Sequence, residues 1–97
     1  MKVIMKMKWN GITPDKYENV KGIVKWDQNP PKGLLLHAAG FNHAALHITD
    51  IWESEEDLDN FMHDRLMPGI AKTTHIGGPP EVEVFPAHSL YLPLLKF

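Results

Sequence analysis

Residues 2–9 carry an apolar side chain at every second position, with lysines at three of the positions between them. A period of two indicates a strand with one buried face. The apolar run at 34–39, the segment at 46–52 and the alternation of glutamate with valine that opens 81–88 indicate three more strands. Pro86 puts the last strand at an edge of the sheet or at a bulge, because proline cannot donate to a strand ladder.

Two further segments have apolar residues at helical spacing behind clear start signals. Thr13 is an N-cap residue, followed by a proline and an aspartate, and we expect this helix to fade near Trp26. Ser54, followed by three acidic residues, begins the second helix. Pro68 disfavours helical geometry at Met67, so we expect the second helix to end or kink there.

The two central strands are expected to form a hairpin that turns at 40–43. A helix through 44–46 competes, since alanine and leucine favour helices, but the β-branched residues within 48–51 favour a strand. The resulting order of strand, helix, strand, strand, helix, strand is typical of ferredoxin-like folds. We therefore predict one α+β domain over residues 1–97, a ferredoxin-like βαββαβ arrangement with a four-stranded antiparallel sheet.

A sheet that is apolar on both faces implies a partner. The run at 34–39 supplies apolar groups to both faces, and the third strand carries Ala45 and Ile51 on the face opposite its main apolar row. Two helices cover only one face, so we expect a homodimer in which two sheets pack face to face as a dimeric α/β barrel, burying about 800 Å² per subunit. The alternative is that the apolar tail at 91–97 folds back over that face.

Composition and charge exclude several classes of function. Hydrophobic residues make up 43% and charged residues 23% of the chain, which favours a folded domain over a disordered one. A net charge of −2 with scattered lysines predicts no nucleic-acid binding, and no apolar run approaches the roughly 20 residues that span a membrane. The lack of cysteine excludes disulfides and a cysteine nucleophile, and we expect a cytoplasmic location.

Three polar residues on the central strands are candidate catalytic groups. His37 lies in an apolar run and is a candidate general base, because imidazole titrates near neutral pH; the alternative is a hydrogen-bonded core or interface histidine. His47 comes close to His37 only if the hairpin register puts both on one face. Asp50 is unusual within a strand and either orients a histidine or caps a backbone amide.

Four aromatic residues are candidates for lining a substrate pocket, although core packing is the common role of such residues. They are Trp52, Tyr17, Phe41 and Phe61. His43 and His47 have the spacing of a helical pair of metal ligands, but a strand separates them by about 13 Å, too far to share one ion. We therefore expect no metal site.

Three stretches of the chain resemble the small dimeric α/β-barrel proteins, a group that includes the antibiotic-biosynthesis-monooxygenase-like domains and many members of unknown function. They are 33–37 (GLLLH), 40–41 (GF) and 50–56 (DIWESEE), of which Trp52 running into the Ser54 cap is the most recognisable part. The resemblance implies a cleft between sheet and helices that holds a small aromatic or apolar molecule. It also implies chemistry without metal or flavin, in which the deprotonated substrate itself reacts with oxygen.

Other relatives in this group degrade haem, isomerise lactones or only bind ligands. The haem-degrading proteins use an asparagine, which Asn10 matches, and a tryptophan and a histidine where this chain has Phe61 and Ala71. That departure argues against haem degradation. The leading hypothesis is a cofactor-free, monooxygenase-like homodimer that acts on an aromatic or polyketide-like molecule; the alternative is a non-catalytic ligand-binding or dimerising structural domain.

Overall fold

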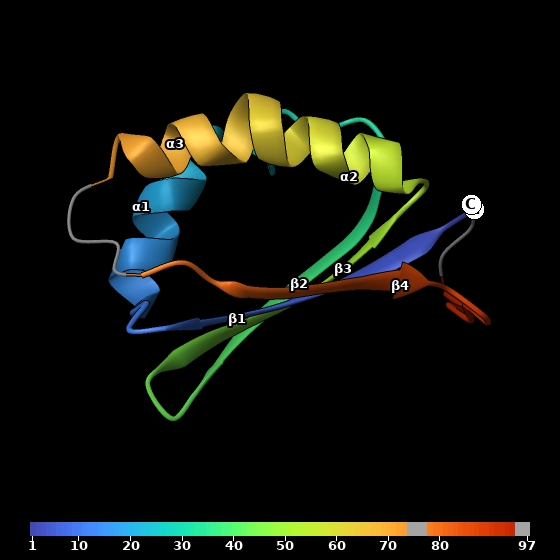
Figure 1. Cartoon of the computed structure of the whole chain (residues 1–97), viewed down its shortest axis with the longest axis horizontal. Coiled ribbons are helices and arrows are strands. Elements are labelled where there is room, and N and C mark those ends of the chain that lie inside the picture. Colours follow the sequence, from blue (N-terminus) through green and yellow to red (C-terminus); the bar gives the residue numbers. More distant parts are fainter. Residues whose placement is uncertain (74–77, 95–97) are drawn as a thin grey trace.

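The computed structural model describes residues 1–73 and 78–94 and has the expected βαββαβ order (Figure 1). The elements are β1 (Val3–Asn10), α1 (Pro14–Val24), β2 (Leu34–Asn42), β3 (Ala45–Trp52), α2 (Glu55–Phe61), η1 (Met62–Leu66), α3 (Met67–Ala71) and β4 (Glu81–Pro86). The strands form one antiparallel sheet in the order β2-β3-β1-β4. The predicted fold class is confirmed, and β4 occupies an edge as Pro86 indicated.

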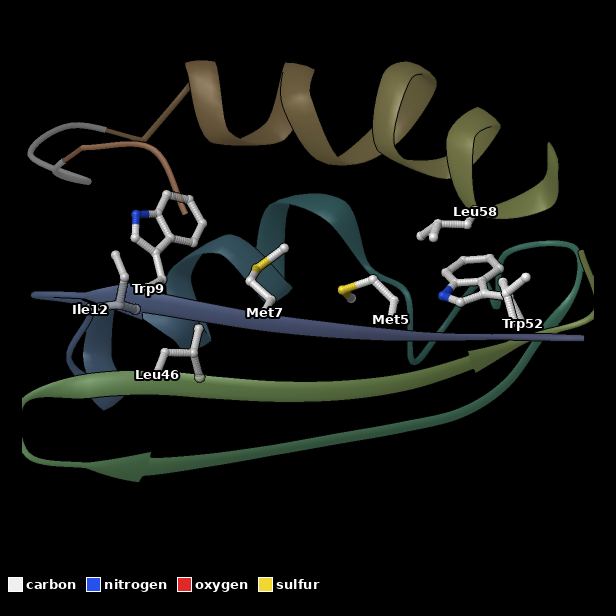
Figure 2. Packing of buried hydrophobic residues seen from close by; sticks show 8 residues of the cluster. Met5, Met7, Trp9, Ile12, Leu46, Trp52 and Leu58 are labelled. Atoms are coloured by element: carbon white, nitrogen blue, oxygen red, sulfur yellow. The ribbon is translucent and has the colours of Figure 1, made fainter. Parts of the chain in front are cut away.

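The core lies between the sheet and the helices. Alternate residues of β1 point toward the helices and are almost fully buried, while the lysines between them point away. Leu46 and Trp52 from β3 and Leu58 from α2 complete the same cluster (Figure 2). The period of two in the sequence therefore identified the buried face of the central strand correctly.

Side-chain caps begin both helices where the sequence predicted. The Thr13 hydroxyl accepts a hydrogen bond from the Lys16 backbone N–H at 3.3 Å, and the Ser54 hydroxyl accepts one from the Asp57 N–H at 3.1 Å. Each bond satisfies a backbone donor that has no partner within the helix.

The hairpin between β2 and β3 turns later than predicted. Residues 40–42 still belong to β2, and the two-residue loop is His43-Ala44, with φ angles of 51° and 60°. A loop with two positive φ angles has the twist that joins antiparallel strands. The competing helix through 44–46 is thus wrong, and the register pairs His37 with Asp50 and Gly40 with His47.

The second helix does not end at Met67. It continues to Ala71 as α3, after one wide turn, η1, in which the Met67 N–H bonds to the Met62 carbonyl five residues earlier. Proline inside a helix clashes with the carbonyl four residues before it, and a wide turn relieves that clash. We expected Pro68 to end or kink the helix. The helix instead accommodates Pro68 by the wide turn η1 and continues to Ala71.

The face of the sheet that points away from the helices has an apolar end and a polar middle. Ile4, Leu36, Ile51 and Phe85 come together at the apolar end, whereas Lys6, Lys8, His47, Thr49, Glu81 and Glu83 make the polar middle. The tail, which was the alternative to a partner subunit as cover for this face, leaves Tyr91 and Leu94 81% and 95% exposed, and residues 95–97 lie outside the described chain. None of the described helices is both long and apolar enough to cross a bilayer.

Candidate functional site

His37 and Asp50 lie opposite each other on β2 and β3, on the face that points toward the helices. His37 Nδ1 is 2.7 Å from Asp50 Oδ1. Asp50 is 5% exposed, so its carboxylate is removed from water and depends on protein partners. Asp50 was expected either to orient a histidine or to cap a backbone amide, and its side chain contacts the histidine.

Trp52 is the second partner of this carboxylate. Its indole N–H donates to Asp50 Oδ2 at 3.2 Å, and its side chain is fully buried. Residues two apart on a strand share a face, which explains how Trp52 reaches Asp50. Because indole nitrogen can only donate, Asp50 Oδ2 accepts the bond from Trp52. An ionised carboxylate can only accept, so with Asp50 ionised the hydrogen between Oδ1 and His37 is carried by His37 Nδ1.

Tyr17 from α1 closes the chain of hydrogen bonds on the other side of the histidine. Its hydroxyl oxygen is 2.7 Å from His37 Nε2, and the two ring planes are 4° apart. A neutral histidine that donates from Nδ1 accepts at Nε2, so the tyrosine hydroxyl donates here. Burial, with smaller contributions from Glu18, Asp50 and Asp27, raises the pKa of Tyr17 to about 12.

Aromatic rings surround this chain of hydrogen bonds. Trp26 lies 5.3 Å from His37 and 5.7 Å from Tyr17 between ring centroids. Phe41 meets Tyr17 edge-on at 6.1 Å, and Phe61 lies 5.3 Å from Trp52. All four aromatic residues predicted as pocket lining are therefore at or beside the site.

Trp26 is a neighbour that the sequence did not single out. It follows the end of α1, beyond Lys25, whose left-handed backbone (φ 60°) turns the chain. Helical periodicity does not predict the direction of a side chain beyond the end of the helix. The contact between Trp26 and His37 could therefore not be predicted from the sequence pattern.

His47 is not part of the cluster. The register places it beside Lys8 and Gly40 on the opposite face of the sheet, where it is exposed. A shift of one residue in the hairpin would have reversed this outcome. Of the two registers considered, the structure has the one that separates His47 from His37, so His47 does not tune His37 through direct contact.

Three cavities lie between the sheet and the helices, and Met7 and Leu66 line all of them. The largest, about 270 Å³, lies between β1 and the η1–α3 segment and is bordered mainly by apolar side chains. Cavities of about 40 Å³ beside His37 and about 30 Å³ beside Tyr17 lie next to it. Met7 and Leu66 thus separate the apolar space from the polar cluster.

The described residues, 1–73 and 78–94, contain no group of three His, Cys, Asp or Glu side chains arranged to hold a metal ion. Tyr17, His37 and Asp50 supply groups for hydrogen bonding and proton transfer next to an apolar cavity.

Comparison with known proteins places the fold. No protein-family model and no curated protein matches the sequence. Among solved structures, the chain is similar to SnoaB, a cofactor-independent oxygenase from Streptomyces nogalater, with a TM-score of 0.69 and 13% identity over 95% of this chain and 97% of that one.

Two further structures illustrate the range of relatives. A monooxygenase from the gene ActVA-Orf6 of Streptomyces coelicolor, in complex with the ligand nanaomycin D, matches with a TM-score of 0.63 and 20% identity over 94% of this chain and 91% of that one. NE2512, a protein of unknown function from Nitrosomonas europaea, matches with a TM-score of 0.65 and 15% identity over 95% and 94%. The chain therefore has the antibiotic-biosynthesis-monooxygenase-like fold, as the resemblance predicted, and fold is what identities this low establish.

Proposed function

We propose that this protein is an enzyme that removes a proton from a small aromatic or polyketide-like molecule, with His37 as the base. The observation that carries the proposal is the continuous hydrogen-bonded chain from Tyr17 through His37 to Asp50. A carboxylate held against one imidazole nitrogen fixes the tautomer and stabilises the imidazolium that forms when the other nitrogen takes a proton. Trp52 supports the proposal by fixing the second oxygen of Asp50.

The reaction proposed to follow is oxygenation without a cofactor. Of the similar structures, one is described as a cofactor-independent oxygenase and another as a monooxygenase with nanaomycin D bound. By analogy, the electrons that reduce dioxygen come from the deprotonated substrate itself. Asp50, His37 and Tyr17 would generate and hold that anion, while the apolar surroundings exclude water.

The apolar cavity of about 270 Å³ is the proposed site for the body of the ligand. Pockets for small molecules commonly occupy about 300–1,000 Å³, so a ligand that also reaches the polar cluster has to displace Met7 or Leu66. Methionine suits such a position because its unbranched side chain adapts to what it contacts.

A second copy of the chain is the proposed partner. The outer face of the sheet combines the apolar end with a depression of about 510 Å³ over its polar middle. On that face Lys6 lies opposite Glu83 and Lys8 lies opposite Glu81 on the neighbouring strand. When two such faces pack about a twofold axis, the apolar end of one can contact the apolar end of the other. The lysine row of one copy can then face the glutamate row of the other, which favours the homodimer.

A non-catalytic ligand-binding domain is the second candidate. The observation in its favour is that both ring nitrogens of His37 already have partners and the largest inner cavity is apolar. A binder would respond to a ligand but would have no turnover to lose when His37 is replaced.

A thermal-shift screen followed by oxygen-uptake assays tests these proposals. Phenols, quinols, polycyclic ketones, fatty acids and haem would be screened; a ligand at a hundredfold excess over its Kd stabilises the native state by about 2.7 kcal/mol. We expect an aromatic hydroxy compound to give the shift and to support oxygen uptake that His37→Gln abolishes. His63→Ala, at an exposed histidine on η1, is the matched control and should behave as wild type. Binding with no oxygen uptake would favour the non-catalytic candidate, and no shift from any class would contradict both.

A further inference from the structure

We propose that Tyr17 is the residue that touches the acidic hydroxyl of the substrate, and that His37 receives the proton through the Tyr17 hydroxyl group. This inference rests on the proposed function, since it assumes that the site deprotonates its ligand. It differs from a direct transfer to His37, which would require Tyr17 to move away from the histidine.

Both nitrogens of His37 are occupied. Nδ1 faces Asp50 Oδ1 and Nε2 faces the Tyr17 hydroxyl, each at 2.7 Å. An imidazole ring has no third site for a hydrogen bond in its plane. His37 also borders the cavity of about 40 Å³, but it has no free lone pair to offer a ligand there.

The Tyr17 hydroxyl, in contrast, can accept a second hydrogen bond. A phenol has one hydrogen to donate and two lone pairs to accept with, and the bond to Nε2 uses only the hydrogen. The ring of Tyr17 borders the cavity of about 30 Å³, which has an entirely apolar lining and shares Met7, Trp9 and Leu66 with the large apolar cavity. A ligand whose apolar body fills the large cavity would therefore reach the ring of Tyr17 when it extends past Leu66, and in the proposed complex its hydroxyl bonds to the Tyr17 oxygen at the end of that ring.

The surroundings of Tyr17 suit a relay rather than a base. Asp50 on β3 and Glu18 and Asp27 on and after α1 place negative charge near the ring, while His37 on β2 is its hydrogen-bond partner. Burial and these charges raise the pKa of Tyr17 to about 12, so the residue keeps its proton over the working range of a protein. A tyrosine that stays neutral can accept one proton only as it gives up another.

The proposed step is a concerted shift of two protons. The O–H bond of the substrate breaks and its proton bonds to the Tyr17 oxygen, while the original Tyr17 proton moves to His37 Nε2. The products are a substrate oxyanion, a neutral Tyr17 and a His37 imidazolium held against the Asp50 carboxylate. No electrons leave the substrate in this step, and the site favours a ligand hydroxyl more acidic than that of tyrosine, such as a phenol or an enol conjugated to a carbonyl.

The experiment uses 5-hydroxy-1,4-naphthoquinone as the probe, because its phenolate absorbs at longer wavelength than its phenol. The chain has no cysteine to react with the quinone. The absorbance of the bound probe would be followed against pH for wild type, Tyr17→Phe and His37→Gln, with Kd measured separately by fluorescence quenching. Tyr91→Phe is the matched control, because Tyr91 is the other tyrosine of the chain and is 81% exposed.

We expect wild type and Tyr91→Phe to ionise the bound probe at a pH at least about one unit below that of the free probe, a tenfold shift in the ionisation equilibrium. Tyr17→Phe keeps the ring against Trp26 and Phe41, so the probe should bind within about threefold of the wild-type Kd, yet ionise as it does in water.

Three other outcomes would each contradict a specific part of the proposal. If Tyr17→Phe ionises the probe as wild type does while His37→Gln fails, His37 takes the proton directly and the relay is wrong. If wild type binds the probe without ionising it, the proposed base is wrong as well. If wild type does not bind the probe while it binds an apolar ligand without a hydroxyl, the hydroxy-aromatic ligand class is wrong.

Discussion

Asp50 holds the candidate site together, since its two carboxylate oxygens bond two different side chains. Its neighbours are positioned by elements that lie far apart in the sequence: α1 brings Tyr17, and β2 brings His37. A buried carboxylate of this kind is costly unless it is fully paired, so replacing it should affect the site more than an exposed carboxylate would.

Replacement of Asp50 by asparagine keeps the size of the side chain and removes its charge. We expect Asp50→Asn to lower kcat for oxygen uptake by about 10²–10⁴-fold with a small change in ligand Kd, because the imidazolium loses its stabilising partner. Asp59→Asn, an exposed carboxylate on α2, is the control. Equal rates for the two variants would exclude a role for Asp50 in proton transfer.

The raised pKa of Tyr17 gives a pH dependence with a definite sign. The group is stabilised in its neutral form by the fold, so its contribution to the free energy of unfolding is fully present below about pH 10, the usual tyrosine pKa, and is lost as the pH rises toward about 12. Urea denaturation across that range should show a steeper loss of stability for wild type than for Tyr17→Phe. Parallel curves for the two proteins would mean that the folded state does not perturb this phenol.

At the scale of elements, the wide turn η1 is the feature that joins the helix to the pocket. It places Met62 and Leu66 against the cavities, and Arg65 on the same turn donates hydrogen bonds to the carbonyls of Val24 and Lys25 at the end of α1. The turn thus links the helix that carries Tyr17 to the wall of the pocket. Wide helical turns occur often at functional sites.

Truncation of Leu66 should join the cavities. We expect Leu66→Ala to cost about 2 kcal/mol of stability and to increase affinity for ligands longer than the single apolar cavity. Leu58→Ala is the matched control, because Leu58 is buried on α2 but borders none of the three inner cavities. Thermal shifts with a ligand series compare the two, and the same ligand profile for both would mean that Leu66 does not divide the pocket.

At the scale of the whole molecule, the order of elements and the buried face of β1 could be read from the sequence. Alternation and helix caps are local signals, and both caps form as predicted. The site was partly predictable for the same reason, since Asp50 within a strand is locally unusual. The position of His47 depends on where the His43-Ala44 loop begins, and the orientation of Trp26 depends on tertiary packing; neither is a local property.

The outer face of the sheet carries the prediction about assembly. Thr49 points outward from the central part of β3, next to Lys6 on β1. Thr49→Arg would bury an unpaired charge in the proposed homodimer, so we expect sedimentation velocity to show dimer for wild type and monomer for the variant. Asn19→Arg, on the exposed side of α1, should remain dimeric, and a wild-type monomer at all concentrations would contradict the proposed partner.

Oxidation of the methionines around the apolar cavity would report whether oxygen is activated there. Met7, which is buried, and Met62, which is half-buried, border the cavity, whereas Met67, at its rim, is 61% exposed and Met1 is 87% exposed. No cysteine competes for oxidants. If oxygen is activated in the pocket, peroxide that escapes productive reaction will convert the sulfur atoms nearest to it into sulfoxides. Mass spectrometry after turnover should therefore find sulfoxide at Met7 and Met62 in excess of the exposed Met1 and Met67, and the reverse pattern would indicate oxidant arriving from solvent.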